Sequence, residues 1–266
     1  MTPVTVQRGD GPIVLGLPHT GTFVPDDVHA HLNDTGRKLA DTDWHIDQLY
    51  DGLLEGVTIV RATHHRYVLD VNRDPSGQSL YPGQNTTGLV PLTDFEGRDI
   101  WDTAPDADEI ARRLDALHRP YHAAMAAEMT RIRDLHGVAI HYDCHSIRSR
   151  IPFLFDGTLP DFNIGDDSGT TCDPRITAAV EGICHGAEDY TSVTNGRFRG
   201  GWTTRHYGRP AEGWHAVQME LAQSSYLTDE APPWAYDPTK ATALRRHLGA
   251  ILTTLAELAP TLGGIR

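Results

Sequence analysis

The pattern of apolar and polar positions predicts five β-strands along the chain. Three short runs are mostly apolar, and two longer runs alternate apolar with polar residues as a strand does. The expected strands are Ile13–Leu17, Val57–Val60, Tyr67–Val71, a strand from Val138 that ends in DCHS (residues 143–146), and Trp214–Ala222.

Helical spacing predicts three helices. In each of them apolar side chains recur three or four positions apart, which places them on one helix face. The second contains Pro120, which we expect to kink or split it, and Gly137 ends it. The expected helices are Lys38–Leu54, residues 106–136 and Thr239–Leu258.

Strands interleaved with helices are typical of α/β proteins, which is the predicted fold class. No internal repeat, charge block or low-complexity linker divides the sequence, so we expect a single domain over residues 1–266. Two stretches rich in Gly, Pro and Asn, Ser76–Gly88 and Asp156–Pro174, are predicted loops. Loops of this length in a compact domain usually carry function.

Composition excludes several classes of protein. The 266 residues carry 23 Lys and Arg against 36 Asp and Glu, a net charge of −13 that disfavours nucleic acid as a partner. Apolar runs fall far short of the roughly 20 residues of a membrane-spanning helix. No secretory signal is readable, so we expect a cytoplasmic protein without membrane contact. Cys144, Cys172 and Cys184 lack CxxC spacing and are expected to be reduced, with Cys144 a small buried hydrophobic residue.

Residues suited to chemistry end three predicted strands. They are His19, His145 and Glu220. A single one of the 15 histidines is more often structural than functional, but agreement among three strand ends favours a common site. Open α/β sheets place their sites at the carboxyl ends of the strands.

His19 and His145 supply two of the three protein ligands of a catalytic zinc site, in which the third ligand is often a carboxylate. Asp43 and Asp47 lie on adjoining turns of the predicted helix. At about 100° per residue, Asp43 lies within the apolar stripe and Asp47 at its edge. Asp43 is the favoured ligand, because a carboxylate in an apolar face needs a partner. Asp47 stays the alternative, and a helix cap near Thr42 is the other role open to Asp43.

Arginines cluster in three motif-like segments of this acidic chain. Seven of the 21 arginines fall in HHRYVLDVNRD, DCHSIRSR and NGRFRGGWTTRHYG. The planar guanidinium group matches a carboxylate, so a small anionic substrate is predicted. Structural ion pairs with the acidic residues are the competing explanation for about half of them.

With these motifs the sequence resembles the N-formylglutamate deformylase (N-formylglutamate amidohydrolase) family, which performs the last hydrolysis of one histidine-degradation route. Seven motifs in the expected order span nearly the whole chain, which makes the resemblance specific. They are PHTGTFVP, ADTDWHIDQLYDG, RYVLDVNRDP, LYPGQNTTGLVPLTDF, DCHSIRSRIPFLF, NGRFRGGWTTRHYGRP and VQMELAQSSYL.

That family is similar to zinc carboxypeptidases and aspartoacylase, so the resemblance implies a three-layer α/β/α fold with a central mixed sheet. It also implies that His19 and His145 hold zinc. The carboxypeptidase pattern HxxE is broken here, because Thr22 follows His19 at the third position. The carboxylate ligand must therefore come from elsewhere, and Asp43 is the residue we expect.

The resemblance also implies roles for substrate-binding residues. Glu220 matches the catalytic glutamate, and Arg66 matches an arginine that polarises the scissile carbonyl. Asn72 and Arg73 match a pair that grips one substrate carboxylate, and Arg205 of the Gly-rich loop is the arginine expected at the other.

The implied reaction is the zinc-dependent hydrolysis of N-formyl-L-glutamate to formate and L-glutamate. One rival is a related zinc deacylase or carboxypeptidase acting on another N-acyl amino acid, which would use the same site with a different pocket. Another is a non-catalytic metal- or anion-binding protein, and Glu220 speaks against it, because a storage site does not need a base beside its metal.

Overall fold

The structure is a computed structural model that describes residues 1–78 and 85–262. Part of the loop Ser76–Gly88 and of the motif LYPGQNTTGLVPLTDF lies outside the described residues. Within them, seven strands form one sheet. The strands are β1 (Val4–Gln7), β2 (Ile13–Leu17), β3 (Thr58–Ala62), β4 (Ala139–Ile147), β5 (Phe162–Gly165), β6 (Ser192–Thr194) and β7 (Trp214–Ala222).

The sheet is mixed, with the strand order β1-β3-β2-β4-β7-β5-β6. Its centre, β3-β2-β4-β7, is parallel throughout, whereas β1 and β5 run antiparallel to their neighbours β3 and β7. The carboxyl ends of the four central strands therefore meet at one edge of the sheet, where α/β proteins place their sites.

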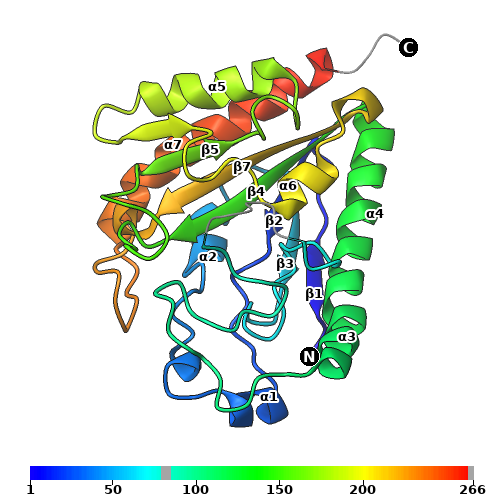
Figure 1. The fold of residues 1–266 in the computed structure, drawn as a ribbon. Coiled ribbons are helices and arrows are strands. Elements are labelled where there is room, and N and C mark those ends of the chain that lie inside the picture. Colours follow the sequence, from blue (N-terminus) through cyan, green and yellow to red (C-terminus); the bar gives the residue numbers. More distant parts are fainter. Residues whose placement is uncertain (79–84, 263–266) are drawn as a thin grey trace.

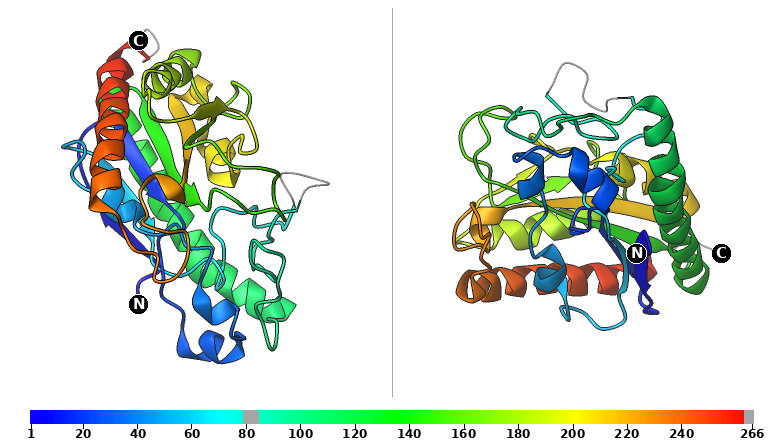
Figure 2. Two further views of the ribbon diagram at one scale, coloured as in Figure 1. Left: turned by 90° about the vertical axis from the view of Figure 1, so that its left-hand side faces the viewer. Right: turned by 90° about the horizontal axis from the view of Figure 1, so that it is seen from below.

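Helices cover both faces of the sheet (Figures 1 and 2). On one face α5 and α7 share a hydrophobic core with Ile13, Leu15 and Leu17, and on the other α4 shares one with Val14. This alternation along β2 is the period of two that a strand imposes on its side chains. The predicted three-layer α/β/α fold with a mixed sheet is confirmed. The helices are α1 (Asp26–His31), α2 (Ile46–Tyr50), α3 (Ala107–Arg113), α4 (Arg119–His136), α5 (Pro174–His185), α6 (Trp202–Tyr207) and α7 (Pro238–Leu258).

Most elements lie where the sequence pattern predicts them. β2 and β7 coincide with their predictions, β4 begins one residue after Val138 and ends one residue beyond DCHS, and α7 begins one residue before Thr239. The second predicted helix splits near Pro120 into α3, a π turn over Leu114–His118 and α4, which ends at Gly137. The proline causes this split, because it lacks an N–H and its ring clashes with the preceding turn.

The predicted helix Lys38–Leu54 is wrong. Only Ile46–Tyr50 is α-helical, and Leu39 and His45 have positive φ angles of 50° and 58°, which no α-helix contains. The residues between them form a loop held by tertiary contacts, among them a bond from the Asp43 N–H to the carbonyl of His19 at 3.1 Å. The apolar spacing reflects burial of this loop and not a helix.

Two further predictions are corrected. Tyr67–Val71 is buried but forms turns instead of a strand. Its apolar side chains pack in the core with those of α4, while its backbone hydrogen bonds go to residues outside the sheet, such as the bond from the Asp70 N–H to the carbonyl of Leu89. The predicted loop Asp156–Pro174 contains β5, whose Phe162 and Ile164 are buried.

No helix within residues 1–78 and 85–262 combines the length and the apolar character needed to cross a bilayer. Cys144, Cys172 and Cys184 are buried and form no disulfide, and Cys144 lies in the apolar core as expected. The single domain over residues 1–266 stays a prediction.

Gly16 in β2 provides room for the buried ring of His141. A Cβ at residue 16 would lie 2.3 Å from His141 Cε1, so we expect Gly16→Ala to destabilise the fold by about 1–3 kcal/mol, the usual cost of overpacking. Urea unfolding measures this difference.

Gly182→Ala in α5 is the matched control. A Cβ there meets no described atom within 4 Å, so alanine should raise stability by roughly 0.5–1 kcal/mol through its better helix propensity. Equal stability of Gly16→Ala and wild type would show that the His141 ring moves aside without cost.

Candidate metal centre and active site

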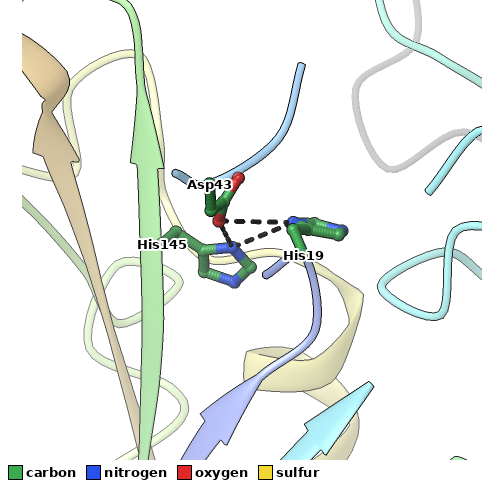
Figure 3. Close-up of side chains that lie close together, drawn as sticks. All are labelled: His19, Asp43 and His145. Carbon is green, nitrogen blue, oxygen red and sulfur yellow. Dashed lines mark hydrogen bonds and ion pairs between the residues drawn. The ribbon is translucent and has the colours of Figure 1, made fainter. Parts of the chain in front are cut away.

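Three electron-pair donors converge at the carboxyl edge of the sheet (Figure 3). His19 follows β2, His145 lies near the end of β4, and Asp43 comes from the loop before α2. The two histidine Nδ1 atoms are 3.2 Å apart, and Asp43 Oδ2 lies 3.6 Å from His19 Nδ1 and 3.3 Å from His145 Nδ1. All three side chains are almost wholly buried.

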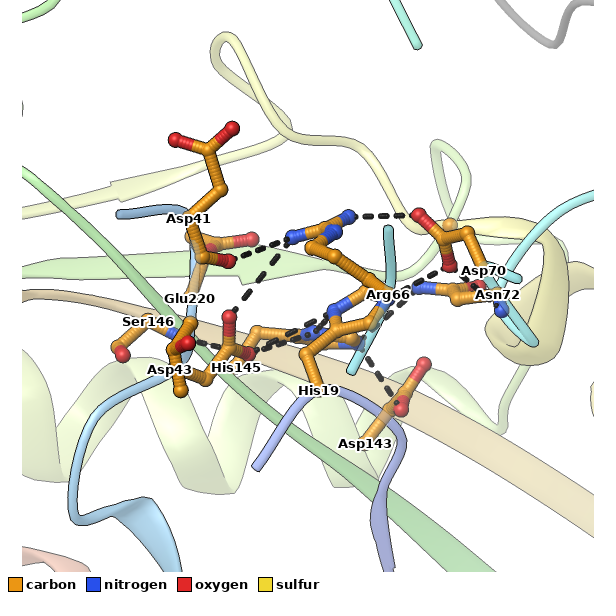
Figure 4. Close-up of polar contacts among 12 residues, drawn as sticks. His19, Asp41, Asp43, Arg66, Asp70, Asn72, Asp143, His145, Ser146 and Glu220 are labelled. Atoms are coloured by element: carbon orange, nitrogen blue, oxygen red, sulfur yellow. Dashed lines mark hydrogen bonds and ion pairs between the residues drawn. The ribbon is translucent and has the colours of Figure 1, made fainter. Parts of the chain in front are cut away.

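The outer nitrogen of each histidine lies beside a buried carboxylate (Figure 4). His19 Nε2 lies 2.7 Å from Asp70 Oδ1, and His145 Nε2 lies 3.0 Å from Asp143 Oδ1. Although burial favours protonation of Asp70 and Asp143, neighbouring cationic groups hold the pKa of each below its usual range. An ionised carboxylate only accepts, so the Nε2 of His19 carries a hydrogen toward Asp70, whereas the Nε2 of His145 lies near both Asp143 and the side-chain amide of Asn72 at 3.2 Å.

His19, Asp43 and His145, called the triad below, lie close enough to shift the pKa values of Asp43 and His145. Burial alone would raise the pKa of Asp43, but His19 and His145 bring it below its usual range. Burial alone would lower the pKa of His145, but Asp143 and Asp43 raise it well above its usual range. The charged forms of Asp43 and His145 therefore stabilise each other.

The donor set fits a divalent metal. Two imidazole nitrogens and one carboxylate oxygen are the ligands of many catalytic zinc sites, and tetrahedral bonds of zinc place neighbouring ligand atoms about 3.3 Å apart. The observed separations of 3.2 to 3.6 Å match this spacing. Carboxylates behind both histidines are the usual support of metal-ligating imidazoles.

The loop position of Asp43 is fixed from both sides of the site. Its N–H donates to the carbonyl of His19, and the N–H of Ser146 donates to its Oδ2 at 3.2 Å. Gln223 Nε2 holds the carbonyl of Thr42 at 3.0 Å. The helix-face argument for Asp43 fails with the helix, yet Asp43 is the carboxylate that these contacts bring to the histidines.

Asp47, the alternative ligand, lies elsewhere. It is about one third exposed and pairs with Arg61 at 2.7 Å, away from both histidines. A cap at Thr42 is also excluded, because no helix begins there.

Glu220 stands opposite His145 on the neighbouring strand β7 and lines the same cavity. Burial raises its pKa to about 8, with Asp43 contributing and His145 opposing. Gln218 Nε2 donates to Glu220 Oε2 at 3.2 Å from the same face of β7. A carboxyl group with a pKa near neutrality is suited to both taking and returning a proton.

Arg66 is a buried cation beside the triad. Its Nη2 pairs with Asp70 Oδ2 at 2.8 Å, and its Nη1 lies 3.8 Å from Asp43 Oδ1. Despite burial, Asp70 and Asp43 raise its pKa above the usual range, so it stays charged. Its guanidinium group stacks over the ring of Phe95 at 4.8 Å, which fixes its plane.

A cavity of about 250 Å³ opens onto these groups. Of the expected substrate-binding residues, Arg66, Asn72 and Arg73 line it, together with the triad and Glu220. Arg205 is not among the described lining residues, since it turns to Asp167 at 3.1 Å. Arg197 of the same Gly-rich loop lines the cavity in its place.

Sequence reasoning missed several residues of this site. Asp143 is two positions before His145 on one strand, and a period of two places both on the same face, so this partner could have been predicted from the sequence. Gln218 is related to Glu220 in the same way. Asp70 carried no such signal, because its contact with His19 joins segments 51 residues apart.

Known proteins similar to this chain point in one direction. The sequence profile of the family described as N-formylglutamate amidohydrolase matches residues 11–227. A curated N-formylglutamate deformylase of Pseudomonas aeruginosa is 45% identical over 255 residues, 95% of each chain. A curated N-formylglutamate deformylase of Pseudomonas putida is 44% identical over 262 residues, covering 96% of this chain and 97% of that protein.

Solved structures agree with the fold. The crystal structure of N-formylglutamate amidohydrolase from Ralstonia eutropha JMP134 superposes with a TM-score of 0.81 at 28% identity, covering 98% of this chain and 99% of that one. A gene product of Agrobacterium tumefaciens shares the fold, with a TM-score of 0.73 at 20% identity over 97% and 96% of the two chains.

The triad predicts which carboxylate retains metal. We expect Asp43→Asn to lower the zinc that survives dialysis to well below one ion per chain, because an amide is a poor ligand and removes a negative charge. Asp47→Asn should retain as much zinc as wild type, since Asp47 pairs with Arg61. Elemental analysis of the three proteins decides, and the reverse order would mean that Asp43 is not a ligand.

Proposed function

This chain belongs to the N-formylglutamate amidohydrolase family, and from that membership we propose that it hydrolyses N-formyl-L-glutamate to formate and L-glutamate. The observation that carries the proposal is the shared cavity of the His19, Asp43 and His145 triad, Glu220 and three arginines. It brings together a metal site, a base and cations for an anionic substrate. These are the parts that metal-assisted amide hydrolysis requires.

His19, Asp43 and His145 would hold one divalent metal ion, for which zinc fits best. When bound, the ion supplies Lewis acidity, which acidifies water and polarises the formyl carbonyl. The carboxylate of Asp70 lies against His19 and that of Asp143 against His145, the usual support of metal-ligating imidazoles.

Glu220 acts as the general base and then as the general acid. It takes a proton from the attacking water and returns it to the departing amine of glutamate. Its pKa of about 8 belongs to the buried, metal-free carboxyl group, and positive charge at the triad favours the ionised form that accepts a proton. Gln218 holds one of its oxygens in place.

Arg66 stabilises the negative charge that develops on the formyl oxygen, since it is buried, charged and fixed by Asp70 and Phe95. Arg73 with Asn72 binds one substrate carboxylate. Arg197 replaces Arg205 in our proposal as the group for the second carboxylate, because it lines the cavity.

We extend the proposal to the setting of the enzyme. As a single catalytic domain of the cytoplasm it would act on the N-formylglutamate formed in histidine degradation, without nucleic acid or membrane partners. A related deacylase for another N-acyl amino acid is the alternative, and pocket size separates the two.

Removal of the proposed base tests the chemistry. We expect Glu220→Gln to keep its fold and its zinc and to lose activity by ~10² to 10⁴, the scale for a general acid or base. Formate release and zinc content are measured on the same preparation. Normal turnover by this variant would remove Glu220 from the mechanism.

Substrate preference tests whether Arg73 and Arg197 each bind one carboxylate of the substrate, an arrangement called the double clamp below. N-formylglutamate should exceed N-formylglutamine in kcat/KM by at least ~30, because the amide leaves a guanidinium group without its charged partner, a loss of about 2 to 5 kcal/mol. Arg197→Met should abolish most of this preference, and Arg205→Met should keep it. A ratio near one in wild type contradicts the double clamp, and a preference for N-acetylglutamate favours the deacylase.

A further inference from the structure

Segment 66–73 carries four polar side chains of the site, yet it belongs to no strand. Arg66, Asp70, Asn72 and Arg73 surround the triad and the cavity. Because this segment joins no sheet ladder, its buried carbonyl groups need donors from elsewhere. The position of the segment depends on what supplies them.

One long helical stretch, α3 to α4, supplies three of these donors from side chains. The bonds run from Arg113 Nη1 to the carbonyl of Val68 (3.1 Å), from His122 Nε2 to that of Val71 (2.8 Å) and from His118 Nε2 to that of Arg73 (3.0 Å). The two histidines therefore hold the carbonyls on either side of Asn72.

The π turn aligns these donors. Arg113 and His118 are five residues apart, which in an α-helix would separate them by about 140° around the axis. In the π turn the N–H of Arg119 donates to the carbonyl of Leu114, five residues back, so residues with this spacing lie above one another. His122 follows His118 by four residues and shares its face.

Both histidines are suited to act as neutral donors. Burial lowers the pKa of His118 and brings that of His122 well below its usual range. A carbonyl oxygen only accepts, so the bond to Val71 places a hydrogen on His122 Nε2, and His122 Nδ1 lies 2.8 Å from the hydroxyl of Tyr207, which also donates to the His122 carbonyl at 3.2 Å. That hydrogen points to the carbonyl of Val71.

We propose that His118 and His122 are positioning residues for substrate binding, which hold Asn72 and Arg73 at the metal centre through the backbone on either side of Asn72. The proposal rests on the proposed function, in which Arg73 binds a substrate carboxylate. Among the described residues, the cavity lining includes Asn72 and Arg73 but neither histidine. The histidines act through the segment and do not touch the substrate.

Pairs of amide variants test this role. His122→Gln and His118→Gln keep a donor near the position of Nε2, whereas His122→Asn and His118→Asn place it too close to the backbone to reach the carbonyl. We expect the Asn variants to raise KM for N-formyl-L-glutamate at least ~10-fold with a smaller change in kcat and unchanged zinc, since misplacement by about 1 Å costs up to ~10²-fold. The Gln variants should recover most of the loss.

His136→Asn is the matched control. His136 Nε2 makes the same kind of bond, to the carbonyl of Asp10 at 2.6 Å, at the far end of α4. Its loss should leave KM unchanged.

A double-mutant cycle separates positioning from a general structural effect. If His122 acts through Arg73, His122→Asn in an Arg73→Met background should change KM less than ~3-fold. An equal effect with and without Arg73, or an unchanged KM in folded His118→Asn and His122→Asn, overturns the proposal.

Failure of the proposed function gives a different result. A wild-type protein that releases no formate from N-formyl-L-glutamate would refute that function. Calorimetric titration with L-glutamate would then still measure how tightly the site around Arg73 binds a carboxylate. Equal affinity for L-glutamate in wild type, His118→Asn and His122→Asn would refute the positioning role.

Discussion

Three electron-pair donors held within 3.6 Å of one another, away from water, are the constraint on which this site depends. Lone pairs of His19, His145 and Asp43 repel unless a cation stands between them. The surrounding charges follow from this requirement. Asp70 lies against His19, Asp143 lies against His145, and Arg66 balances the buried carboxylates. A site arranged in this way has the donor set of a divalent metal ion.

The residues around the cavity come from two kinds of backbone, the regular strands of the sheet and irregular segments. The parallel strands β2, β4 and β7 bring His19, His145 and Glu220 to one edge with little freedom, because their backbones are fixed by the ladder. The groups proposed to bind substrate come from irregular segments, residues 66–73 and the Gly-rich loop around Arg197.

Buried irregular segments impose a cost that the rest of the fold must offset. Each carbonyl of residues 66–73 that leaves the sheet needs a donor, and α3 and α4 provide them through Arg113, His118 and His122. The π turn before Pro120 also has a structural consequence, because it places the side chains of Arg113 and His118 on the same face of the helical stretch. These bonds join residues 66–73 to the helices behind them.

The sequence by itself determined the α/β class, the strands β2, β4 and β7, the helix α7 and the strand-end residues His19, His145 and Glu220, because periodicity and strand ends are local properties. It did not determine the loop of Asp43, which has helical apolar spacing, nor the turns of Tyr67–Val71, which have the composition of a strand. Both depart from their local pattern because tertiary contacts, from the carbonyl of His19 and from the donors of α3 and α4, outweigh propensity. The pairing of Asp70 with His19 and the choice of Arg197 over Arg205 at the cavity join residues distant in the chain, so only the folded structure decided them.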